Sequence, residues 1–292
     1  MKQRMLVGWL AALLAAGTLG NAHAALRLNE LYVDPEDRLA PNDEGFGREF
    51  FEIISDAPNE SLAGVWFLEI DGQALNRGIV RQAIDLSAYS TGANGLFLWR
   101  DNDDILVPNP HPDTVIGVGP FVGSRGLLTS GSATFMLVTD FTGAINDDLD
   151  TDLDGVLDAP LPFSGVLDAL GIARNTATAV SYAGAFGGVD FENTSFGPDA
   201  YARLPNSGPY AGMWFAFDTP DGDEDPNYYG PFYARDALDN VLEDGTNVPM
   251  HIAHQFFLTP GSANQSFVPE PASASLALLG MLGALGIRRR GC

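Results

Sequence analysis

The chain has 292 residues, of which 46% are hydrophobic and 18% are charged, so it can bury a core and is not a highly charged disordered chain. Its 38 acidic and 15 basic residues give a net charge of −23, which repels phosphate backbones and argues against nucleic-acid binding. The single cysteine, Cys292, is the last residue, which excludes an intrachain disulfide and a cysteine-based zinc site within the body.

The first 24 residues are organised as a secretory signal peptide. Lys2 and Arg4 precede an apolar run over residues 5–16, and the segment ends in an A-x-A cleavage site at residues 22–24. We expect signal peptidase to cut between Ala24 and Ala25. An N-terminal membrane anchor is the alternative, but the apolar run is short for a membrane span. The pattern therefore predicts an exported protein.

Residues 25–267 are expected to form one all-β domain. Short runs of β-branched and aromatic residues are bounded by clusters of Gly, Pro, Asn and Asp, and they lie at residues 26–33, 49–54, 65–70, 95–99 and 133–138. No amphipathic helix longer than two turns and no repeat of fixed period stands out in the sequence. This spacing predicts a β-sandwich or a barrel.

Two glutamates in the second of these strands could suggest acid–base chemistry. Glu49 and Glu52 are three positions apart, so on a strand they point to opposite faces and cannot act as a facing pair. We expect both carboxylates to be solvated at a strand edge or rim rather than catalytic.

Several segments resemble the lamin-tail domain. They are an opening Asn-Glu strand at residues 28–31, an EFxE-type strand at 49–53, a Leu-x-Gly-x-Trp strand at 62–68 and a terminal Thr-Pro-Gly-x-x-Asn at 259–264. The resemblance implies an immunoglobulin-like β-sandwich that acts as an accessory or surface module without catalytic residues. Residues 142–255 exceed the compact family pattern, so we expect long loop insertions there.

An acidic stretch within that region has metal-ligand spacing. Residues 147–158 hold six aspartates, and Asp150, Asp152, Asp154, Gly155 and Asp158 match positions 1, 3, 5, 6 and 9 of a calcium loop, with the Val156 carbonyl at position 7. The loop resembles those of dockerin and thrombospondin type 3 repeats. Leu161 occupies position 12, where a calcium loop normally has a bidentate Glu, so we expect an affinity of about 10⁻⁴ to 10⁻³ M. Asp148 or Asp168 could complete the shell, and a solvated acidic turn without a metal is the alternative.

Other residues leave two alternative functions open. A secreted metal-dependent hydrolase could use the acidic stretch or the pair His251 and His254, although no nucleophile or base motif accompanies them. A carbohydrate-binding module could use aromatic side chains, but we expect these in the core: Trp66, Trp99, Trp214, Tyr228 and Tyr229. A second acidic cluster at 218–225 lacks metal-ligand spacing, and we expect it to be an exposed loop, as we do His111, between two prolines.

The C-terminus has three successive parts. Pro269-Glu270-Pro271 is followed by the uncharged residues 272–287 and then by Arg288, Arg289 and Arg290. As a helix the uncharged part would span about 24 Å, against about 30 Å for a hydrocarbon core, and the arginines would stay on the cytoplasmic side. Residues 268–292 resemble the PEP-CTERM sorting signal of Gram-negative bacteria. This implies processing by an exosortase at the Pro-Glu-Pro motif and an association with extracellular polysaccharide.

Together these features predict a non-enzymatic, exported surface or extracellular-matrix protein with a structural or interaction role and calcium as its ion. Its precursor would be anchored in the inner membrane before exosortase releases it to the cell surface or matrix.

Overall fold

The computed structural model describes residues 25–33, 49–101, 109–122, 131–174, 178–192, 198–204, 212–218, 229–238, 240–249 and 258–264, with only the backbone for 229–233 and 241–249. The expected signal peptide and the sorting signal lie outside these residues. So do His251, His254, Tyr228 and all of the second acidic cluster except Asp218. Among the described residues, no helix has the length and apolar character needed to cross a membrane.

The described chain is all-β, as predicted, with one short 3-10 helix, η1 (Ala183–Phe186). A large sheet of eight strands has the order β13-β12-β11-β10-β1-β2-β5-β6. In chain order its strands are β1 (Leu26–Tyr32), β2 (Phe50–Ser55), β5 (Leu96–Arg100), β6 (Val115–Val118), β10 (Ala200–Arg203), β11 (Trp214–Asp218), β12 (Tyr229–Asp236) and β13 (Val241–Pro249).

A small sheet of five strands has the order β4-β3-β7-β8-β9. Its members are β3 (Val65–Asp71), β4 (Val80–Asp85), β7 (Ala133–Thr139), β8 (Gly165–Ala173) and β9 (Val189–Glu192). Neighbouring strands are antiparallel except for the pairs β5–β6 and β8–β9, so both sheets are mixed. The five strands predicted from the sequence correspond to β1, β2, β3, β5 and β7.

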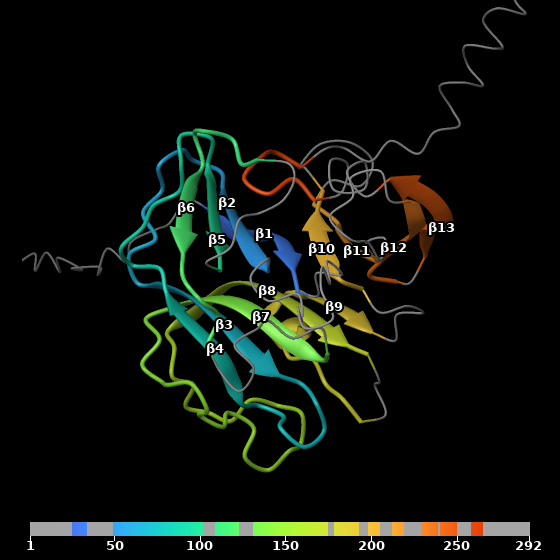
Figure 1. Cartoon of the computed structure of the whole chain (residues 1–292). Helices are drawn as coiled ribbons and strands as arrows, with labels where there is room; N and C mark the ends of the chain where they lie inside the picture. The colour runs from blue at the N-terminus through green and yellow to red at the C-terminus, as the bar shows by residue number, and fades with distance from the viewer. Residues whose placement is uncertain are drawn as a thin grey trace, which may run out of the picture.

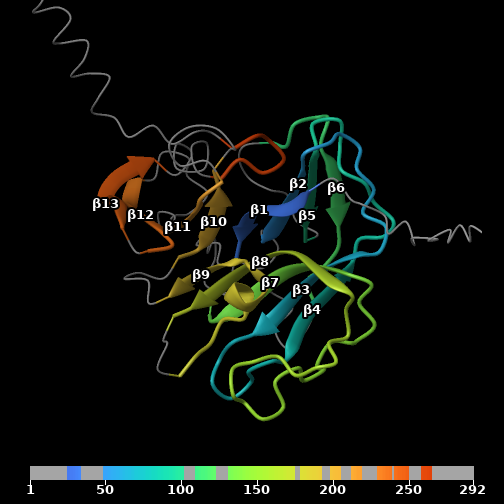
Figure 2. The same cartoon turned by 180° about the vertical axis from the view of Figure 1, so that it is seen from behind.

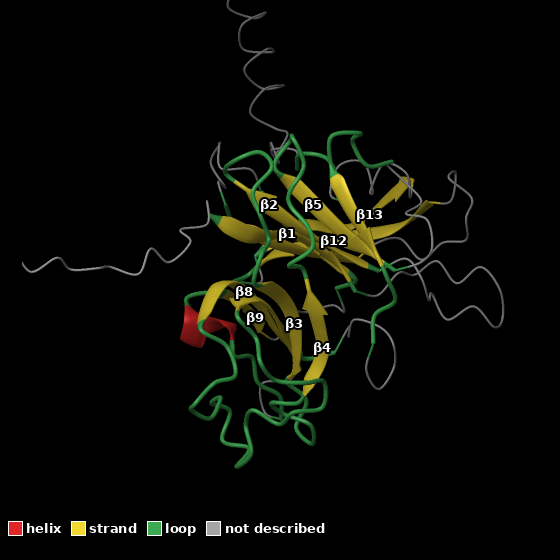
Figure 3. Cartoon of the chain, turned by 90° about the vertical axis from the view of Figure 1, so that its left-hand side faces the viewer, coloured by secondary structure: helices red, strands yellow, loops and turns green. Residues whose placement is uncertain are grey.

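The two sheets pack face to face as a β-sandwich (Figures 1 and 3). Alternate residues of the strands point inward and form one apolar core, and the ring of Phe51 on β2 stacks on that of Phe67 on β3 with centroids 3.8 Å apart. Two-residue alternation is what a strand with one face on a core requires. The shared core makes the two sheets one folding unit.

Each sheet also buries apolar side chains on its outer face. On the large sheet Tyr32, Phe50 and Phe217 are covered together with Leu258, which comes from the end of the described chain. On the small sheet Leu68 and Met136 are covered by Leu149 and by other side chains of the long β7–β8 connection, seen below the small sheet in Figure 2. Segments outside the sandwich therefore cover both of its outer faces.

Residues 142–255, where we expected insertions, contribute strands to both sheets. β8 and β9 complete the small sheet, and β10 to β13 form half of the large one. The only long connection of this stretch that is described throughout is the one between β7 and β8. This part of the chain is therefore structural as well as loop-forming.

Our interpretation of Glu49 and Glu52 as solvated residues is wrong. β2 lies inside the large sheet between β1 and β5, and the two residues are 2% and 0% exposed. The predicted alternation is correct, because Phe51 faces the core while Phe50 faces outward. For Glu52 the error concerns the outer face, which the sequence pattern could not show to be covered.

Candidate functional site

The acidic loop, residues 147–158, lies over the outer face of the small sheet. Its Leu149 is 8% exposed and packs with the outer-face cluster, while the backbone of Asp147 accepts a 2.9 Å hydrogen bond from the Val80 amide of β4. Gly78 makes this close approach possible: it has φ +79°, and a Cβ there would lie 2.4 Å from the Asp150 nitrogen. The sheet therefore positions the loop.

Asp150 is the interior anchor of the loop. Its side chain is fully buried, and its carboxylate accepts hydrogen bonds from the amides of Asp154 and Gly155, both at 3.0 Å, and from the Tyr182 hydroxyl at 2.8 Å. Burial and the neighbouring Asp150 carboxylate raise the pKa of Tyr182 well above its usual range, so this phenol stays a donor. Gly155 has φ +87°, which allows the sharp turn predicted at this position.

Three of the predicted ligands come together. One oxygen from each of Asp150, Asp152 and Asp154 can be chosen so that all three lie within 4.8 Å of one another, and the last two side chains are exposed. Two oxygens bound to one calcium ion at about 2.4 Å are at most about 4.8 Å apart, so this spacing fits one ion. The predicted D-x-D-x-D alternation therefore folds into a cluster open to solvent on one side.

The other candidate carboxylates make contacts of their own. The Asp158 carboxylate accepts hydrogen bonds from the Thr151 amide at 2.8 Å and the Thr151 hydroxyl at 2.6 Å, and these bonds lower the pKa of Asp158. Asp168 lies on β8, where it pairs with Arg203 at 2.6 Å, and Asp148 accepts a bond from the Asp150 amide. Val156 donates its amide to Asp154, and its side chain is 62% exposed.

A second polar group, which the sequence analysis did not assign a role, lies on the outer face of the large sheet. We call it the buried carboxyl network; its members are Asn29, Glu30, Glu52, Thr259, Gly261 and Asn264. Glu30 accepts hydrogen bonds from the Thr259 amide at 2.9 Å and the Thr259 hydroxyl at 2.8 Å. Glu52 accepts them from the Asn29 side-chain amide and the Gly261 amide, both at 2.5 Å.

Asn264 completes the network. Its side-chain oxygen accepts a 2.8 Å bond from Asn29, and its amide donates a 2.6 Å bond to the Arg203 carbonyl. Desolvation raises the pKa of Glu30 to about 8, and it raises that of Glu52 well above its usual range, with the neighbouring Glu30 adding to the effect. A pattern in the sequence could have grouped the members of this network, because each of them belongs to one of the segments that resemble the lamin-tail domain.

The aromatic residues considered for sugar binding are mostly structural. Trp214 is 1% exposed and lies under the Arg203 guanidinium at 4.6 Å, whereas Trp66 and Trp99 are half-buried and pack against apolar clusters. The His111 side chain is exposed beside Asp113, as expected for a loop residue. These positions favour a core role for the three tryptophans.

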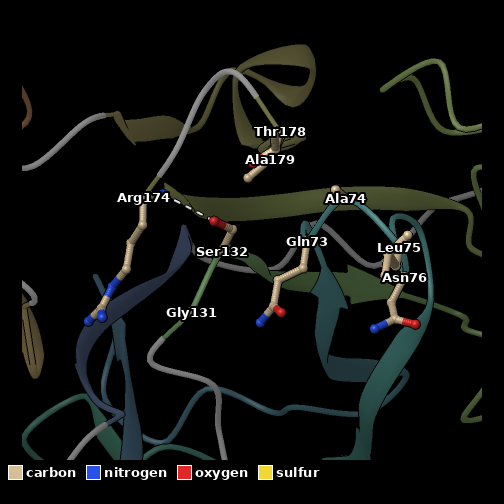
Figure 4. Close-up of a pocket in the computed structure, with 9 residues that line it drawn as sticks. All are labelled: Gln73, Ala74, Leu75, Asn76, Gly131, Ser132, Arg174, Thr178 and Ala179. Atoms are coloured by element: carbon tan, nitrogen blue, oxygen red, sulfur yellow. Dashed lines mark hydrogen bonds between the residues drawn. The ribbon is translucent and has the colours of Figure 1, made fainter.

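A separate open cleft of about 510 Å³ lies at one end of the small sheet (Figure 4). Gln73, Asn76, Ser132 and Arg174 are among its lining residues, and the Arg174 amide donates a 3.1 Å bond to the Ser132 hydroxyl. The Arg174 guanidinium donates to the Pro198 carbonyl at 3.1 Å. None of the predicted site residues lines this cleft.

No family model, curated protein or solved structure matches this chain.

Proposed function

We propose that this chain is an exported, non-enzymatic β-sandwich module of the lamin-tail type, stiffened by calcium and sorted to the cell surface or extracellular matrix of a Gram-negative bacterium. The observation that supports the module type most strongly is the buried carboxyl network. The opening Asn-Glu strand, the EFxE-type strand and the terminal Thr-Pro-Gly-x-x-Asn are distant in sequence, and Glu30 and Thr259 are 229 positions apart. Their polar residues nevertheless bond to one another.

This convergence gives the motif residues a structural reason to occur together. A buried carboxyl group needs donors, and the terminal segment supplies them from Thr259 and Gly261. The polar side chains of these motifs bond to one another within the network. A structural or interaction role for an immunoglobulin-like module is consistent with this arrangement.

Calcium at the acidic loop is the second part of the proposal. Asp150, Asp152 and Asp154 would supply carboxylate oxygens, the Val156 carbonyl would take the seventh loop position, and water would fill the exposed side. Three carboxylates within 4.8 Å repel one another, and a divalent cation would remove that repulsion. With Asp158 bonded to Thr151 and Leu161 at position 12, we expect weak binding, of the order found in extracellular modules.

Sorting is the third part, and it rests on residues 268–290 of the sequence. Replacing Pro269-Glu270-Pro271 by Ala-Ala-Ala should leave export intact but stop processing by an exosortase. The unprocessed full-length variant should therefore accumulate in the inner membrane of a strain that makes the sortase. Membrane fractionation and the mass of the released protein measure this.

A matched control removes the same residue types elsewhere, with Pro220, Glu224 and Pro226 changed to Ala. This control should be processed and released like the wild type. Release of the Pro269-Glu270-Pro271 variant at the wild-type rate and mass would show that the sorting assignment is wrong. Retention of both variants would point to a general folding defect instead.

A further inference from the structure

The described chain ends in a segment, Leu258–Asn264, that belongs to no strand but covers the outer face of the large sheet. Leu258 is 2% exposed and packs with Tyr32, Phe50 and Phe217. In Figures 1 and 2 this segment runs as the orange-red loop above β1 and β10, toward the green loop that precedes β6. We call it the C-terminal segment.

Gly261 is the point at which this segment is held from both sides. Its amide donates to Glu52, and its carbonyl accepts bonds from the His111 amide at 2.9 Å and the Thr114 hydroxyl at 2.6 Å. Gly261 has φ +70°, and a Cβ there would lie 2.5 Å from the Pro110 side chain, so only glycine fits. Side chains of β1 and β2 and the loop before β6 therefore hold the C-terminal segment.

The two carboxyl groups that hold this segment also oppose each other. Glu30 and Glu52 are directly paired across β1 and β2, and both are fully buried. Within the described chain, every hydrogen-bond donor to either group is neutral: two backbone amides, one side-chain amide and one hydroxyl. Two ionised carboxylates at buried positions without a cation are unfavourable, so the pair retains a proton.

Among the described residues, no charged group on the surrounding elements donates a hydrogen bond to the pair. The Arg203 guanidinium of β10 pairs with Asp168 of the small sheet, while His111 and Asp113 are exposed in the adjacent loop. Glu49 directly precedes β2, three positions from Glu52, and Arg100 ends β5 opposite Phe50 rather than opposite Glu52. Hydrogen bonds from Thr259 and Gly261 lower the two pKa values, but burial outweighs them and raises the pKa of Glu30 to about 8.

We propose that Glu30 and Glu52 form a pH-sensitive clasp, which holds the C-terminal segment on the large sheet while the pair retains a proton and releases it when both carboxyls ionise. The inference rests on neither calcium binding nor sorting. The clasp is therefore a switch between a docked and a released C-terminal segment.

The direction of the pH effect follows from proton linkage. A carboxyl group exposed by opening returns to a pKa near 4.5, whereas in the closed state that of Glu30 is about 8. Opening therefore releases at least one proton between these values, so the opening equilibrium rises at least about tenfold per pH unit up to about pH 8, and the raised pKa of Glu52 carries the rise to higher pH. The clasp is closed at mildly acidic pH and weakened at mildly alkaline pH.

Hydrogen exchange of the full exported chain tests this proposal. Protection factors, which correct for the intrinsic pH dependence of exchange, are measured from pH 5 to pH 9 for the amides of Thr259 and Gly261. The amides of Phe67 and Leu137, paired at the centre of the small sheet, report global opening. We expect protection at the first two amides to fall at least about tenfold per pH unit between about pH 5 and pH 8, well beyond any change at the reference amides.

Two variants complete the test. Glu30→Gln/Glu52→Gln keeps the shape of the clasp without its titration and should abolish the pH dependence. If that double variant does not fold, Glu30→Gln removes the neighbouring charge that adds to the effect of burial on the pKa of Glu52, so the loss of protection should level off at a lower pH than in the wild type. Protection at Thr259 and Gly261 that is independent of pH in the wild type, or that falls in parallel with the reference amides, would overturn the clasp.

Discussion

At the scale of single residues, buried carboxyl oxygens accept hydrogen bonds both from nearby amides and from donors in distant parts of the chain. The Asp150 carboxylate is held by two loop amides and the Tyr182 hydroxyl, and the Glu30 carboxyl by the amide and hydroxyl of Thr259. Removing one donor leaves a buried acceptor without its full set of partners, which costs more than the bond itself contributes. The donors are therefore as important as the acidic residues.

Thr259→Val tests, at the clasp, how much the loss of one donor to a buried carboxyl group costs. The substitution keeps the backbone amide bond to Glu30 but replaces the hydroxyl, which is buried, with a methyl group. We expect the free energy of unfolding to fall by about 1–3 kcal/mol, measured by urea denaturation at pH 6. Thr178→Val, at an exposed threonine, should stay within about 0.5 kcal/mol of the wild type. Equal effects at the two positions would argue against the buried hydrogen bond as the cause.

At the scale of elements, the strands can be predicted from the local sequence. The segments that cover the outer faces of the sheets cannot. Runs such as Val65-Trp66-Phe67-Leu68 favour strands because β-branched and aromatic side chains suit a pleated surface. The alternation also predicted correctly that Phe51 and Glu52 face opposite sides. It could not predict that Glu52 is buried, because its cover, residues 258–264, lies more than 200 positions along the chain.

The acidic loop, like the strands, could be predicted because its pattern is local in the sequence. Metal-loop spacing is local, so Asp150, Asp152 and Asp154 could be grouped from the sequence, and the structure brings them together. The role of Asp158 depends on the path of the chain beyond Gly155, which the spacing does not determine. Pairing of Asp168 with Arg203 depends on how the two sheets face each other.

Docking of the acidic loop on the small sheet can be tested with two leucines of the same loop. Leu149 is 8% exposed and packs on the outer face, whereas Leu153 is 44% exposed. Leu149→Ala should lower the free energy of unfolding by about 2–4 kcal/mol, and Leu153→Ala by less than about 0.5 kcal/mol. Denaturant unfolding of both variants measures the difference. Similar small losses at both positions would mean that the loop does not depend on the sheet.

At the scale of the whole molecule, the sandwich supports two polar centres on opposite outer faces. The acidic loop lies on the small sheet and the clasp on the large one, with the shared aromatic core between them. The proposed function is therefore that of a module in which calcium stiffens the acidic loop and protons hold the C-terminal segment on the large sheet. Calcium binding is the part of this proposal with the most specific geometry.

Thermal unfolding with calcium, added at constant ionic strength, tests this claim most directly. An ion that binds only the folded chain adds about 1.4 kcal/mol at ten times its dissociation constant, a rise of a few degrees in melting temperature. We expect this rise in the wild type and its loss in Asp152→Ala/Asp154→Ala. Magnesium should have a smaller effect, because it requires tight octahedral geometry. Equal calcium shifts in the two proteins would show that calcium only screens the acidic surface, and would contradict a calcium site in the acidic loop.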